Sequence, residues 1–217
     1  MCEVCHKHAL NVQGASSFNS DISKWDVSSV IDMRNMFVAA SSFNSDISRW
    51  DSSSVTDMGS MFEEASTFNS DISNWDVSSV IKMNYMFTDA LSFNSDISKW
   101  NVSSVTSMVD MFYFATSFNS DISSWNVACV TNMAGMFSGA SSFNSDISKW
   151  DVSSVKDMYS MFFVASSFNQ NLCPWGLKLS TTFNYDNAMY SFISSGCPNK
   201  NSPTGLTGPW CAASCLA

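Results

Sequence analysis

The sequence predicts an α/β repeat solenoid, and three observations support that fold class. The residue types between Phe18 and Ser42 return every 25 residues. Each repeat carries apolar columns with two different spacings, one typical of a strand and one of a helix. A unit this short buries its apolar face only against its neighbours, so the units must stack. We therefore expect one elongated domain of about seven coils. Full units begin at Phe18, Phe43, Phe68, Phe93, Phe118 and Phe143.

The first half of each unit predicts one short strand. Trp25 and Val27 are two residues apart, and polar Lys24, Asp26 and Ser28 alternate with them. This alternation is typical of a strand with one buried face and one face in solvent.

The second half of each unit predicts one short helical segment. Its apolar residues are spaced so that they would share one face of a helix, and Ser29 with Asp32 three residues later resembles a capping box. The apolar residues of the first unit are Val30, Met33, Met36, Phe37 and Ala40. With Phe18, Ile22, Trp25 and Val27 they form the expected core columns, in which Ser52 is a polar break.

The ends of the chain depart from the repeat and predict two caps. Residues 1–17 are interpreted as a degraded repeat that forms an N-terminal cap, and residues 18–180 as the solenoid. Residues 181–217 are expected to form a C-terminal helix, from Thr181 to Ile193, and a cysteine-rich cap that contains several turn-forming prolines and glycines.

The cysteines favour an oxidising location, either extracellular or at the cell surface. Six of the 7 cysteines lie near the two ends, where disulfides stabilise loop-rich segments most, and Cys129 is expected to be the odd thiol. The six are Cys2, Cys5, Cys173, Cys197, Cys211 and Cys215. No apolar run is long enough to span a membrane, and the first residues do not resemble a secretory signal, so the chain is either not exported or a mature fragment.

The net charge of −9, with only 10 Lys and Arg residues, argues against a nucleic-acid partner. Cationic partners and metal ions fit this charge better. Two columns of acidic residues repeat along the stack, and like charges on neighbouring units need solvation or neutralisation.

The first acidic column admits two interpretations, which are local turns to backbone N–H groups or bound calcium. Its members are Asp21, Asp46, Asp71, Asp96, Asp121 and Asp146. For the second column, which begins at Asp26, neutralisation by Lys and Arg two residues away is expected. The asparagine column from Asn19 to Asn169 is expected to form a buried hydrogen-bonded ladder.

The repeat unit Phe-Asn-x-Asp-Ile-Ser-x-Trp-Asp-Val-Ser-x-Val-Thr-x-Met-x-x-Met-Phe-x-x-Ala resembles that of the BspA-like bacterial surface proteins. The resemblance covers roughly residues 8–180. It implies a leucine-rich-repeat-like solenoid and a surface protein engaged in adhesion or protein binding. It supplies no catalytic residues and implies nothing about the cysteine-rich ends.

Two surfaces are candidates for binding a protein or glycan. The first is the solvent face of the expected strands, and the second is a contact patch on the helical side. The strand-face residues are Lys24, Asp26, Arg49, Asp51, Asp76, Lys99, Asn101, Lys149 and Asp151. The contact patch is Tyr113, Phe114, Phe163 and Val164.

Catalysis and bound cofactors are not expected. The chain has 2 histidines, both near its start, so no Ser-His-Asp or Cys-His arrangement can form within the repeats. Cys2, Cys5 and His6 match the signature for covalent haem attachment, and together with His8 they could instead bind zinc. A disulfide or a structural cap explains these residues as well.

The sequence therefore favours a non-enzymatic extracellular module for adhesion or protein binding. One alternative is a structural protein that assembles through its caps or its aromatic patch. Another is a ladder protein that binds calcium or ice through its regular polar columns.

Overall fold

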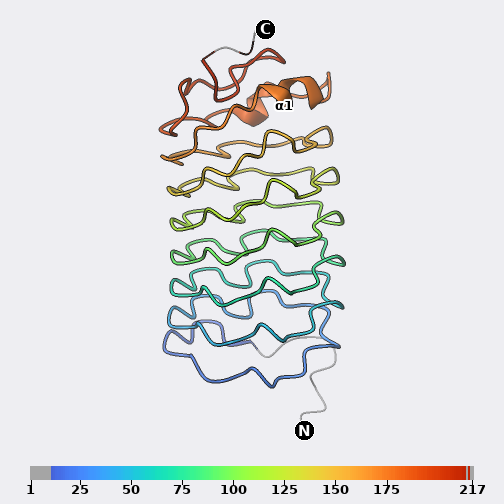
Figure 1. Ribbon diagram of the computed structural model, residues 1–217, viewed down its shortest axis with the longest axis vertical. Coiled ribbons are helices and arrows are strands. Elements are labelled where there is room, and N and C mark those ends of the chain that lie inside the picture. The colour runs from blue at the N-terminus through green and yellow to red at the C-terminus, as the bar shows by residue number, and fades with distance from the viewer. Residues whose placement is uncertain (1–10, 214, 216–217) are drawn as a thin grey trace.

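The computed structural model describes residues 11–213 and 215, which wind in stacked coils of 25 residues (Figure 1). Backbone N–H groups of one coil donate to carbonyls of the next. In the middle of the stack, Met83, Tyr85, Phe87 and Asp89 donate at 2.8–3.2 Å to Ser107, Val109, Met111 and Tyr113. Each coil is therefore joined to its neighbours along one side by a continuous set of hydrogen bonds.

The predicted coil of one strand and one helix is wrong, because the 25-residue coils hold neither. Parallel bridges of one residue pair link neighbouring coils, beginning with Asp32 to Asp57, and no longer strand forms among the described residues. Where the strand was expected, Trp50 and Val55 donate within their own coil to Ile47 and Ser52. Aspartate side chains accept further N–H groups there and so compete with pairing between coils.

The predicted helical segment is a pair of consecutive turns, which we call the tandem turn. Met36 and Ala40 donate to the carbonyls of Met33 and Phe37, three residues earlier, and Asn35 and Ala39 have φ of 60° and 56°. A positive φ before the closing residue is typical of type II turns. The apolar spacing fits both a helix and a tandem turn, so spacing alone could not separate them.

The two helices of the described chain, α1 (Cys173–Lys178) and η1 (Tyr185–Ala188), lie after the last regular coil. The helix predicted from Thr181 to Ile193 is therefore wrong, since η1 covers part of it and a further tandem turn follows. Tyr190 and Ser194, with φ of 62° and 55°, are the left-handed residues of that turn.

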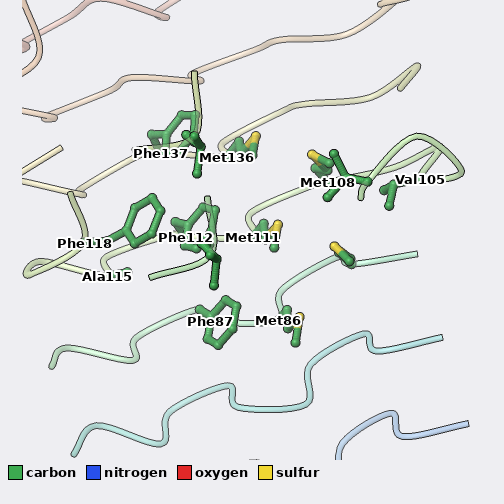
Figure 2. Packing of buried hydrophobic residues seen from close by; sticks show 14 of the residues in the cluster. Met86, Phe87, Val105, Met108, Met111, Phe112, Ala115, Phe118, Met136 and Phe137 are labelled. Carbon is green, nitrogen blue, oxygen red and sulfur yellow. The ribbon is translucent and has the colours of Figure 1, made fainter. Parts of the chain in front are cut away.

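The predicted core columns are confirmed, and they form continuous stacks along the molecule. Figure 2 shows Met86, Met111 and Met136 beside the phenylalanine rings that stack from coil to coil. The Phe87 and Phe112 ring centroids are 5.6 Å apart, and Phe112 lies 3.8 Å from Phe118 of the next coil.

Polar atoms in the core of the 25-residue coils bond to the neighbouring coil, whereas the Trp210 indole N–H and the Tyr185 hydroxyl, after the last regular coil, have no partner among the described residues. The indole N–H of Trp100 donates to the carbonyl of Ile72 at 3.0 Å, and other tryptophans of the column repeat this bond. Ser52, the polar break, is 1% exposed and donates to the carbonyl of Asp76. The stack therefore tolerates a hydroxyl at a core position because a carbonyl lies within reach.

Two disulfides hold the C-terminal cap, Cys173–Cys215 and Cys197–Cys211. The cap covers the last coil, since Leu172 donates to the carbonyl of Trp210. Cys129 is exposed and unpaired, as expected. The disulfides favour an oxidising location outside the cytoplasm. Among the described residues, no helix has the length and apolar character needed to cross a bilayer.

Candidate binding surface

The first acidic column lies in solvent, and its carboxylates are engaged locally. Asp71 accepts the backbone N–H of Ser73 at 2.9 Å, and each other member accepts that of the serine two residues later. The serine hydroxyl and then its N–H lower the pKa of Asp71 below its ordinary value. All six carboxylates predicted as a calcium ladder, from Asp21 to Asp146, therefore have protein partners.

The second column has the same local structure. Asp26, Asp51, Asp76 and Asp151 each accept the N–H of the serine two residues later, and Asn101 accepts that of Ser103. The serine hydroxyl is the largest cause that lowers the pKa of Asp51, so the expected neutralisation by Lys and Arg is not its leading cause. The Asp-x-Ser spacing in the sequence could have indicated these local hydrogen bonds.

The residues predicted to bind on a strand face stay exposed although the strand is absent. The basic members, Lys24, Arg49, Lys99 and Lys149, are exposed beside the aspartate and asparagine turns. We call this part of the surface, residues 19–28 and their equivalents at 25-residue intervals, the repeated side.

The asparagine ladder forms, but it lies in solvent and not in the core as predicted. The side-chain oxygen of Asn94 accepts the backbone N–H of Asn119 at 2.8 Å, and the same bond links neighbouring coils from Asn19 to Asn169. Every asparagine in the column is exposed. The ladder therefore ties coils together at the surface.

Candidate metal ligands gather nowhere in residues 11–213, which hold no group of three or more His, Cys, Asp or Glu side chains able to bind an ion. Cys2, Cys5, His6 and His8, the predicted haem or zinc ligands, lie outside the described residues.

A groove of about 520 Å³ separates the last regular coil from the cap. Met133 donates to Asp157, 24 residues later, whereas Met158 donates to Asn187, 29 residues later, so the coil with α1 is five residues longer. Side chains that line the groove include Lys156, Thr182 and Asn184.

The coils differ from one another mainly where the tandem turns project, and we call this surface the turn edge. It comprises the left-handed residue of each turn and the residue before it. In the first turn these are residues 34–35, 59–60, 84–85, 109–110, 134–135, 159–160 and 189–190; in the second they are 38–39, 63–64, 88–89, 113–114, 138–139, 163–164 and 193–194.

Every exposed aromatic side chain of the described residues lies on the turn edge. The exposed aromatics are Tyr85, Phe114, Tyr159, Phe163 and Tyr190. Tyr113 is half-buried and packs edge-on against Phe114, with ring centroids 4.7 Å apart. The predicted contact patch therefore lies within this surface.

Gly139 connects the two halves of the predicted patch. A Cβ atom on Gly139 would lie 2.7 Å from ring carbons of Phe114, so this ring lies directly over the glycine. Gly139 also donates to the carbonyl of Phe163 at 2.7 Å. Phe114 and Phe163, two coils apart in sequence, are thus separated only by a residue without a side chain.

Carboxylates occupy the same edge toward its N-terminal half. Glu63, Glu64, Asp89 and Asp110 project from three successive coils. Burial raises the pKa of Asp89, and Glu64 and Glu63 raise it further. Burial also raises the pKa of Asp110. Sequence reasoning missed Asp89 and Asp110 as surface candidates, although both stand in columns whose residue type changes in every coil.

Comparison with known proteins gives a family without a known activity. A family model described as "Mycoplasma protein of unknown function, DUF285" matches residues 8–114 and again residues 92–195. No curated protein and no solved structure matches the chain.

Proposed function

Because the chain belongs to DUF285, a family of unknown function, we propose a role from its surface: it is a non-enzymatic module that binds a protein or glycan through the turn edge. The observation that carries this proposal is the distribution of exposed aromatic residues, all of which lie on that edge. Aromatic side chains are enriched where proteins bind partners, because they bury a large apolar area at a small cost in conformational entropy.

The contrast between the two surfaces supports this assignment. On the repeated side, each coil presents nearly the same aspartate, serine and asparagine side chains, and these bond to one another or to backbone groups. On the turn edge, successive coils present different side chains over the same backbone. A surface that varies over a constant scaffold allows specific recognition.

Adhesion at a cell surface is the biological role we assign to this binding. The repeat resembles that of BspA-like surface proteins, and the two disulfides fit an oxidising compartment. A partner on another cell or in the surrounding matrix would meet the turn edge along the length of the stack.

The test is a binding screen against immobilised surface proteins and glycans with three forms of the protein. The edge variant is Tyr113→Ser/Phe114→Ser/Phe163→Ser, and the control is Lys99→Ser/Lys149→Ser on the repeated side. We expect saturable binding by the wild type. The affinity of the edge variant should fall by at least about tenfold, and the affinity of the control should change little. Loss in the control alone, or no saturable binding to any protein or glycan, contradicts the proposal.

A further inference from the structure

The turn edge carries negative charge that the protein itself does not neutralise. Its four carboxylates, on Glu63, Glu64, Asp89 and Asp110, accept no hydrogen bond and form no ion pair with any part of the chain that the structure describes. Ten aspartates of the repeated side, by contrast, each accept a serine N–H. Between residues 59 and 194 the edge positions contain no lysine or arginine.

Aromatic residues occupy positions of the same turns as these carboxylates. Tyr85 and Asp89 project from one coil, and Asp110 projects from the next coil with Tyr113 and Phe114. A carboxylate next to an exposed ring can hold a Lys or Arg side chain, because the ring face attracts the cation and the carboxylate pairs with it.

Glycines shape the surface where the two halves meet. A Cβ on Gly135 would overlap the carboxylate of Asp110, and one on Gly139 would overlap the ring of Phe114. Both side chains therefore lie across the following coil, at Gly135 and Gly139.

We infer that the partner of the turn edge is a basic protein segment, in which Lys or Arg side chains alternate with apolar ones. This inference rests on the proposed function and names its partner by charge complementarity. Neighbouring paired chains lie about 4.8 Å apart, so Glu63 and Phe163, four coils apart, are separated by about 19 Å. An extended segment of about six residues spans that distance.

The test measures the affinity of a labelled peptide of alternating Lys and Phe, about eight residues long. The edge variant is Glu63→Gln/Glu64→Gln/Asp89→Asn. The control Asp46→Asn/Asp71→Asn/Asp96→Asn removes the same charge from the repeated side. We expect the edge variant to bind the peptide at least about tenfold more weakly than the wild type does. The affinity of the control should change by less than about twofold, because only edge carboxylates meet the peptide. A matching Glu–Phe peptide should not bind.

Each alternative result has a separate meaning. Equal loss in both variants means that only net charge attracts the peptide, and it overturns the inference. Binding of the Glu–Phe peptide as tight as that of the Lys–Phe peptide also overturns it; if that binding is lost in Tyr113→Ser/Phe163→Ser, the proposed function stands. If no peptide and no immobilised partner binds through the edge, both proposals fail. Self-association lost in the aromatic variant, without peptide binding, would identify a second copy as the occupant.

Discussion

Ten aspartates of the repeated side accept hydrogen bonds from the serine two residues later, and these bonds hold the pKa of each carboxyl below its ordinary value of 3.8. A carboxyl with a lowered pKa in the folded state stabilises that state above the unfolded pKa, and the contribution is lost as the pH falls through the folded value. Asp89 and Asp110 have raised pKa values, so they change the stability in the opposite direction as the pH falls. The ten carboxyls with lowered pKa values outnumber these two.

We therefore expect the thermal midpoint to change little between neutral pH and about pH 5 and to fall steeply below about pH 4. The measurement is a series of melting curves by circular dichroism. Asp51→Asn/Asp76→Asn should show a shallower fall, since Asn101 and Asn126 already accept the same turn bond without charge. A midpoint that stays constant down to pH 2.5 would contradict this explanation.

Asp89 offers a prediction in which stability and binding change in opposite directions. Asp89→Asn removes a charge that burial, Glu64 and Glu63 all disfavour, so it should raise the free energy of unfolding by up to about 1 kcal/mol. It should also weaken binding of the Lys–Phe peptide. Urea unfolding measures the first effect and fluorescence anisotropy the second. A variant that is less stable than the wild type would show that the Asp89 carboxylate has a structural role.

Asp71→Asn is the control, because the Asp71 carboxylate accepts hydrogen bonds from Ser73 that lower its pKa. Its replacement should lower stability slightly and leave peptide binding unchanged. The opposite signs of these two substitutions distinguish the two surfaces of the molecule.

At the level of the element, the tandem turn accepts side chains at left-handed positions, including Tyr85, Phe114 and Val164 with φ of 59°, 50° and 52°. Such residues carry a cost of about 1–2 kcal/mol each in this conformation. The hydrogen bonds to both neighbouring coils hold the backbone there. The fold therefore stores local strain along the surface that we assign to binding.

Gly139→Ala tests the contact between neighbouring turns. The new Cβ would meet the Phe114 ring, so we expect a loss of about 2–3 kcal/mol in the free energy of unfolding. In a Phe114→Ala background the loss should shrink to the cost of the left-handed conformation alone, about 1 kcal/mol. Ala39, at the equivalent position of the first full coil with φ of 56°, shows that alanine fits there. Equal losses in the two backgrounds, measured by urea unfolding, would rule out the contact.

Phe112 and Phe114 provide a matched pair for the core. Phe112 is 0% exposed and stacks on rings of both neighbouring coils, whereas Phe114 is 37% exposed. Phe112→Ala should therefore cost about 3–5 kcal/mol, and Phe114→Ala less than about 1 kcal/mol. Denaturant unfolding of the two variants measures both values. Similar costs would mean that the two rings are not on opposite sides of the backbone.

Much of the coil could be predicted from the sequence because burial follows residue type at a fixed period. Every apolar column from Phe18 to Ala40 was assigned correctly to the core. The backbone conformation was not predicted correctly, because the apolar spacing fits one face of a helix and the inner side of a tandem turn equally well. The residues with this spacing are Met33, Met36, Phe37 and Ala40. Non-glycine residues at positive φ, such as Tyr85, give little sequence signal of the turn.

The candidate surface was predicted in part. Tyr113, Phe114, Phe163 and Val164 were identified as outward residues, but their proximity depends on Gly139, which reads as an ordinary glycine in the sequence. Asp89 and Asp110 could not be distinguished from the other aspartates by residue type alone. What separates them is local bonding that only the structure shows: neither carboxylate accepts the N–H two residues later, whereas Asp57 and Asp157, which also lack a serine there, both do.

For the molecule as a whole, stacking converts one position in a 25-residue repeat into a column that runs the length of the protein (Figure 1). Columns on the repeated side bond within the protein and stabilise the stack. Columns on the turn edge differ from coil to coil, expose aromatic rings, and carry carboxylates that accept no hydrogen bond from the described residues. The architecture therefore separates the residues that hold the fold together from those assigned to binding.

The most direct test of this separation is a photo-crosslinking map of the Lys–Phe peptide on the wild-type protein, with the crosslinked residues identified by mass spectrometry. This separation predicts crosslinks at Tyr85 and Asp89, at Asp110, Tyr113 and Phe114, and at Tyr159, Phe163 and Val164. Crosslinks concentrated on the repeated side, between Asp46 and Asp51 or between Asp71 and Asp76, would contradict it.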